Sequence, residues 1–129
     1  MILILDTHPL VWLLEGSRRL SAIARRTMGN ERNGLVVPTI CLAEAKYLYA
    51  KSRIAIDHGE VSSVIEHGDR FRVCPLNSAV VFKMPVSLDI HDAIICDTAL
   101  LYDDLYDDEV VVVTKDEQIR NSGLVKTVW

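Results

Sequence analysis

The chain has 129 residues, 50% hydrophobic and 25% charged, a composition that excludes a disordered protein and favours one compact domain over residues 1–129. No apolar run approaches the ~20 residues needed to cross a bilayer, and no secretory signal follows Met1, so we expect a cytoplasmic protein without a membrane partner. The net charge of −4 gives no general affinity for nucleic acid, so any such affinity must come from a local site.

Five short apolar runs predict strands, and two of them are apolar on both faces. Strands covered on both faces are typical of the centre of a parallel sheet, which places residues 2–5 and 110–113 there. Pro75 places the strand that contains it at a sheet edge. In chain order, the predicted strands are residues 2–5, 35–37, 71–76, 110–113 and 124–128.

Helical patterns fill the segments between these strands. The predicted helices are residues 9–16, 21–29, 40–52, 57–68, 78–84 and 89–105, with a short helical turn around residues 117–119. Ser21 and Thr39 are the predicted N-caps of the second and third helices, because their hydroxyls can accept from free backbone amides. Strands that alternate with helices predict an α/β domain with a mostly parallel sheet and helices on both faces.

Two carboxylates follow the two strands that are predicted to be central, Asp6 after the first and Asp116 after the fourth. Neighbouring parallel strands end at the same sheet edge, where α/β proteins bind their ligands. The two side chains should therefore converge. Each residue taken alone is equally well explained as the cap of the following helix.

Two predicted helices carry further carboxylates among apolar residues. Glu44 lies in the apolar stripe of the third helix, where burial is costly unless the charge is paired; otherwise it reaches solvent or pairs with Lys51. Asp92 opens the long helix, where it could instead form a capping box with Asp89. Asp97 lies about 140° from Asp92 around this helix at ~100° per residue, which makes Asp92 the stronger candidate for a shared site.

Four carboxylates in one cleft would repel each other unless a cation neutralised them. Oxygen ligands suit Mg²⁺ or Mn²⁺, which typically activate water for phosphate chemistry. Zinc is not expected, because the histidines and cysteines show no ligand spacing. We expect Cys41, Cys74 and Cys96 to be buried, reduced packing residues.

The order and spacing of these residues resemble the PIN-domain family, and within it the VapC-type ribonuclease toxins. The resemblance covers almost the whole chain and implies a single PIN-like domain with five strands in the order 3-2-1-4-5. The matching motifs are Leu5-Asp6-Thr7-His8 followed by Trp12, Ala43-Glu44, Asp89 to Ile95, Val113 to Asp116, and the ending Val128-Trp129.

The resemblance also implies an activity, a Mg²⁺- or Mn²⁺-dependent endoribonuclease that is the toxin of a toxin–antitoxin pair. Its catalytic residues would be Asp6, Glu44, Asp92 and Asp116. Of these, Asp6, Asp92 and Asp116 would hold the metal. Glu44 would orient a metal ligand or the attacking water, and Thr7 and Thr114 would support the acids. Family members are usually homodimers that a cognate antitoxin inhibits.

Some residues fit these expectations less closely. Arg25, Arg26 and Lys46 are candidates for RNA binding, although an ordinary solvated face explains them equally well. Asp97 falls where the family usually has a small or apolar residue, so its role stays open.

Two other kinds of protein are considered. A receiver-like signalling domain also has an acidic Mg²⁺ site, but the third predicted strand ends without an acceptor Asp. A catalytically inactive PIN-fold binding module is the other alternative, and it would have no need of all four acids.

Overall fold

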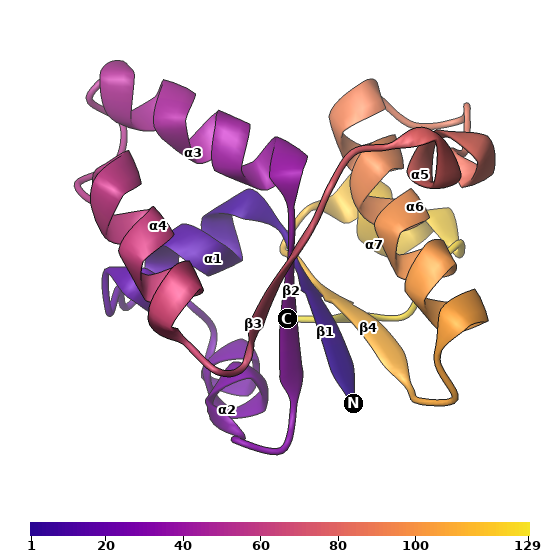
Figure 1. The fold of residues 1–129 in the computed structure, drawn as a ribbon, viewed down its shortest axis with the longest axis horizontal. Coiled ribbons are helices and arrows are strands. Elements are labelled where there is room, and N and C mark those ends of the chain that lie inside the picture. Colours follow the sequence, from indigo (N-terminus) through magenta and orange to yellow (C-terminus); the bar gives the residue numbers. More distant parts are fainter.

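A five-stranded, entirely parallel sheet forms the centre of the computed structural model, which describes residues 1–129 (Figure 1). Its order is β3-β2-β1-β4-β5, which confirms the order expected from the family resemblance. The strands are β1 (Ile2–Leu5), β2 (Gly34–Pro38), β3 (Phe71–Cys74), β4 (Val110–Val113) and β5 (Thr127–Val128).

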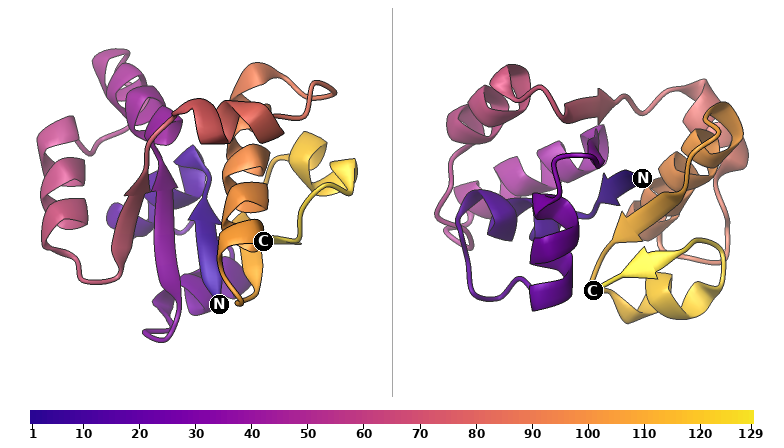
Figure 2. Two further views of the ribbon diagram at one scale, coloured as in Figure 1. Left: turned by 45° about the vertical axis from the view of Figure 1, so that its right-hand side comes forward. Right: turned by 90° about the horizontal axis from the view of Figure 1, so that it is seen from below.

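Seven helices cover the two faces of this sheet. Helices α1 to α4 lie on one side of the sheet and α5 to α7 on the other (Figures 1 and 2). Their bounds are α1 (Thr7–Leu14), α2 (Ala22–Gly29), α3 (Thr39–Ala50), α4 (His58–His67), α5 (Ser78–Lys83), α6 (Ile90–Leu105) and α7 (Glu117–Ser122). None of these helices combines the length with the hydrophobicity that crossing a membrane requires.

The two central strands pair in a register that aligns their carboxyl ends. Strand β1 lies between β2 and β4, and Leu5 is opposite Val113. The backbone N–H of Asp6 continues the ladder by donating to the Val113 carbonyl at 3.1 Å. Both strands are buried on both faces, as their uninterrupted apolar sequences predict. Asp6 and Thr114 are therefore delivered to the same point of the sheet edge.

Local capping decides where several helices begin. Ser21 caps α2 as predicted, its hydroxyl accepting from the Ala24 N–H at 3.0 Å. The N-cap predicted at Thr39 is wrong. Pro38 holds the cap position of α3, and the Thr39 hydroxyl donates instead to the Cys74 carbonyl at 2.8 Å. That bond ties the start of α3 to the end of β3.

Other boundaries differ from the sequence prediction by a few residues. The first helix begins at Thr7 instead of Pro9, because Asp6 supplies its cap. Strand β3 is an edge strand as predicted, but it ends at Cys74, so Pro75 lies outside it. Strand β5 has two residues, and the polar segment before Gly68 is α4, which begins with a capping box.

Burial of β1 predicts a large stability effect from shortening one of its side chains. Ile4 is fully buried, so Ile4→Ala should lower the free energy of unfolding by about 2–5 kcal/mol through lost burial and a cavity. Ile23 on α2 is exposed, so Ile23→Ala should change it by no more than about 0.5 kcal/mol. Urea denaturation measures both values. Equal effects of the two substitutions would contradict the central position of β1.

Candidate functional site

Asp6 is held in one orientation at the carboxyl end of β1. Its Oδ1 accepts from the Thr7 N–H at 2.7 Å, and its Oδ2 accepts from the Thr114 hydroxyl at 2.6 Å. The residue is 8% exposed. Burial raises the pKa of Asp6, and the bonds from Thr114 and Thr7 oppose that rise. The two threonines thus stabilise a charged carboxylate in a nearly buried place.

Glu44 reaches the same edge from α3. One of its oxygens, Oε2, accepts from the Thr7 hydroxyl at 2.9 Å and forms an ion pair with His91 Nε2. The contact with His91 lowers the pKa of Glu44 more than burial raises it, and Glu44 in turn raises the pKa of His91. Glu44 forms its ion pair with His91 and none with Lys51, the partner considered from the sequence, whose ammonium lies over the Tyr47 ring at 5.5 Å from the centroid.

Asp92 and Asp116 complete the acidic cluster. Burial, followed by the charges of Asp116 and Asp6, raises the pKa of Asp92. Asp92 therefore lies close enough to both Asp116 and Asp6 to be repelled by them. Asp89 makes no side-chain capping bond, so the capping box that could have explained Asp92 is not formed.

Asp116 has a structural task in addition to its place in the cluster. Its Oδ1 caps α7 by accepting from the N–H groups of Gln118 and Ile119 at 2.7 and 3.2 Å. Its own N–H donates to the Thr114 hydroxyl at 2.9 Å. Asp6 likewise caps α1. Asp6 and Asp116 therefore each cap a helix and also belong to the acidic cluster, so the two interpretations of these residues do not exclude each other.

An aromatic contact anchors the chain end beside this cluster. The ring centroids of Trp12 and Trp129 are 5.8 Å apart, and the Lys115 ammonium lies 4.8 Å from the Trp12 centroid. Trp12 therefore packs against the end of β5 and against the residue that precedes Asp116. This contact gives a structural reason for the aromatic residues in the opening and closing motifs.

The acidic cluster fits a hard divalent cation in its donor chemistry. It offers carboxylate oxygens, and Asp92 has a pKa raised by its acidic neighbours, a repulsion that a cation would relieve. No three of the chain's His, Cys, Asp and Glu side chains are disposed so that they could hold a metal ion as they lie. A metal site here thus has the appropriate ligands but requires side chains to move.

The nearby cysteines do not suit zinc. Burial raises the pKa of Cys96 to about 12, with Asp92 and Asp6 adding to the rise, and burial also raises the pKa of Cys41. Both thiols are buried and free, and they stay protonated at neutral pH. A cysteine binds zinc only as the thiolate, so these two residues are not zinc ligands.

The three basic residues predicted to bind RNA lie on two different helices. Lys46 is exposed on α3, two residues beyond Glu44. Arg25 and Arg26 lie on α2, at the end of the molecule where the strands begin (Figure 1), away from the acidic edge. Arg25 is bonded there to the Ser17 carbonyl at 2.6 Å. Residues two apart do not share a helix face, so Lys46 does not point where Glu44 points. The structure therefore brings none of these three basic residues into contact with the four acids.

His91 is the site residue that the sequence analysis missed. His91 lies within the motif Asp89 to Ile95, but the sequence analysis assigned it no role, because as a zinc ligand it lacks the required spacing from other ligands. The available signal was adjacency, because His91 directly precedes Asp92 at the start of a helix. A residue beside a candidate ligand can hold the other ligands without binding the metal.

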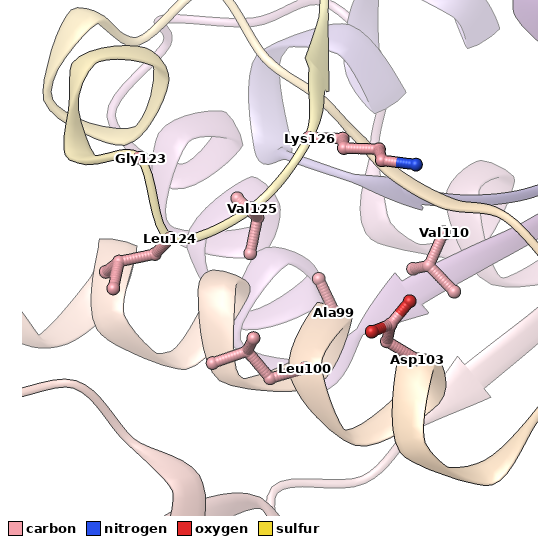
Figure 3. Close-up of a pocket in the computed structure, with 8 residues that line it drawn as sticks. All are labelled: Ala99, Leu100, Asp103, Val110, Gly123, Leu124, Val125 and Lys126. Carbon is pink, nitrogen blue, oxygen red and sulfur yellow. The ribbon is translucent and has the colours of Figure 1, made fainter.

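A cavity of about 300 Å³ lies elsewhere, between α6 and the segment that leads into β5 (Figure 3). It contains none of the four acids. Its lining is Ala99, Leu100, Asp103, Val110, Gly123, Leu124, Val125 and Lys126.

The comparison with known families agrees with this geometry. The family model described as PIN domain matches residues 3–123. The chain belongs to the PIN domain family. No curated protein matches the chain. The strand order also separates it from the receiver-like alternative, since flavodoxin-like receivers have the order 2-1-3-4-5.

Two solved structures share the fold of this PIN domain. One is a chain of VapBC2 from Rickettsia felis, bound to a DNA fragment from the promoter, with 14% identity and a TM-score of 0.67 over 99% of this chain and 98% of that chain. The other is a chain of VapBC-1 from nontypeable Haemophilus influenzae, with 19% identity and a TM-score of 0.63 over 99% and 97%. At these identities, the likeness concerns the fold.

Asp97 is the anomalous carboxylate of the PIN domain. It is fully buried on α6, and neither of its oxygens has a hydrogen-bond partner. Burial raises the pKa of Asp97 to about 6, although Lys83 on α5 opposes the rise. Lys83 pairs with Asp104 instead. An ionised Asp97 should therefore destabilise the fold.

Asp97→Asn should raise the free energy of unfolding at pH 7 by on the order of 1–3 kcal/mol, because it removes the cost of a buried charge. The pKa of Asp97 is about 6 in the folded chain and 3.8 in the unfolded chain. The free energy of unfolding of the wild type should therefore decrease as the pH rises from 3.8 to about 6, and that of Asp97→Asn should not. Urea denaturation at several pH values measures both effects. Asp103→Asn, an exposed change on the same helix, is the control. A stability loss in Asp97→Asn would contradict the argument.

Proposed function

We propose that this PIN domain is a metal-dependent endoribonuclease of the VapC type, which hydrolyses RNA phosphodiesters at Asp6, Glu44, Asp92 and Asp116. The observation that carries the proposal is the convergence of four carboxylates from β1, α3, α6 and the end of β4 on one sheet edge. Family membership and the fold shared with chains of two VapBC complexes support it.

Asp6, Asp92 and Asp116 would hold Mg²⁺ or Mn²⁺, and Glu44 would orient a ligand or the attacking water. Bound there, the metal would activate water and stabilise the oxygens of the phosphate during displacement. Oxygen-only donors and protonated neighbouring thiols favour these ions over zinc.

The supporting residues would fix the carboxylates before substrate arrives. The Thr114 hydroxyl connects two of them, donating to Asp6 while accepting from the N–H of Asp116. Thr7 connects another pair, since its N–H donates a hydrogen bond to Asp6 and its hydroxyl donates one to Glu44. Such preorganisation lowers the cost of orienting ligands during the reaction. Lys46, exposed on α3, would contribute to RNA binding as a positive charge on the same helix as Glu44.

We also propose a cognate antitoxin as a partner, a homodimeric state and a cytoplasmic location. The VapBC complexes support the antitoxin. Exposed apolar side chains on α5 and in the segment that follows it support a protein partner, since Phe82 is 89% exposed and Val86 is 94% exposed. Coexpression with the small protein of the neighbouring reading frame should yield a stable complex without ribonuclease activity. If the coexpressed chain purified without the small protein and kept its full ribonuclease activity, that partner would be rejected.

The purified chain should cleave RNA with Mg²⁺ or Mn²⁺, and a chelator should stop cleavage. Asp6→Asn should lower the rate by about 100-fold or more, because even a residue that only supports a metal ligand typically contributes 10–100-fold. Gel assays and end sequencing of the RNA products measure this. Asp103→Asn is the matched control, and undiminished cleavage by Asp6→Asn would reject the site.

Metal binding should also be visible without RNA. Mn²⁺ should raise the melting temperature of the wild type in proportion to the logarithm of its concentration above the Kd, and Asp6→Asn should abolish most of the rise. Differential scanning fluorimetry measures it. A metal response without RNA cleavage would favour the inactive PIN-fold binding module. The absence of a response would remove the metal from the proposal.

A further inference from the structure

We infer that His91 competes with the metal for Glu44, so that a cation can enter the acidic site only when the imidazole leaves this carboxylate. The inference rests on the proposed function, since it concerns the same four carboxylates. It assigns to His91 a positioning role that limits how tightly the site binds metal.

Two carboxylates contact the two ring nitrogens of His91. Nε2 pairs with Glu44 Oε2, and Nδ1 lies 3.8 Å from Asp92 Oδ1. Glu44 belongs to α3 and Asp92 to α6, helices on opposite faces of the sheet that meet at this edge (Figure 1). The imidazole therefore lies between two acids that are expected to serve the metal.

The contact with His91 occupies an oxygen that Glu44 would use to orient a metal ligand or the attacking water, so the imidazole and the hydrated cation compete for this carboxylate. Glu44 Oε2 already accepts from the Thr7 hydroxyl at 2.9 Å, and the His91 contact adds a second partner. A carboxylate oxygen with two close partners has little room for a metal ion.

The same contact should stabilise the fold when metal is absent. Carboxylates of neighbouring elements repel each other, and an imidazole between Glu44 and Asp92 reduces that repulsion. The side chains of His91 and Glu44 are 30% and 29% exposed, so the pair is partly screened by solvent and its effect is modest. His91 can therefore be displaced by a divalent ion, which neutralises the same acids.

Competition predicts that His91→Asn makes the metal-free protein less stable and makes its binding of Mn²⁺ tighter. The melting temperature in EDTA should fall, because the contact with Glu44 is lost. The Kd for Mn²⁺ should also fall, by about 2- to 5-fold, the factor that corresponds to a partly exposed ion pair. Scanning fluorimetry and titration calorimetry with Mn²⁺ alone measure these quantities without RNA. His67→Asn, an exposed change on α4, should alter neither.

Other roles of His91 give different results. If His91 were a metal ligand, His91→Asn would raise the Kd, and if it were only structural, the Kd would not change; either result overturns the inference while leaving the metal site intact. Loss of Mn²⁺ binding in the wild type as well as in His91→Asn would reject the metal site itself and the inference with it. His91→Ala, expected to lower the Kd in the same way, replaces the Asn variant if that variant does not fold.

Discussion

The register between β1 and β4 is the constraint on which the rest of the structure depends. With Leu5 opposite Val113, Asp6 and Thr114 follow at equivalent places, and the Thr114 hydroxyl reaches Asp6 at 2.6 Å. A slip of one residue would exchange the two faces of the strand and separate these side chains. Hydrophobic burial of two apolar strands thus sets the position of the polar site, although the two strands are more than a hundred residues apart in the chain.

The residues around the acidic cluster offset the electrostatic repulsion among its carboxylates by donating hydrogen bonds to them. Asp6 receives two hydrogen bonds, Asp116 receives two from the start of α7, and Glu44 has Thr7 and His91. Each donor stabilises the charged form of its acid. Asp97 has no such donor, and its pKa of about 6 reflects the lack of one. Asp6, Glu44 and Asp116 thus have the hydrogen-bond donors that a functional carboxylate needs, whereas Asp97 is an isolated buried charge.

The sequence predicts features that depend on local pattern, and it misses those that depend on which elements meet. Apolar runs located β1 and β4, and motif spacing identified the fold and its strand order. The Thr39 cap was wrong because the end of β3 offers its hydroxyl a carbonyl, a contact between segments 35 residues apart. His91 was missed for the same reason, since its partner Glu44 lies on another helix. Periodicity likewise separated Asp97 from Asp92 but did not reveal that Asp97 is buried without a partner.

The two roles of Asp6 and Asp116, as helix caps and as members of the acidic cluster, have a consequence for the evolution of this protein. Both residues begin helices, and asparagine caps a helix about as well as aspartate does. Because the codons of these two amino acids differ by one base, a single mutation could remove the charge and keep the helix start. Under the proposed function, one base change could therefore remove the activity of the site while leaving a folded domain with its surface unchanged.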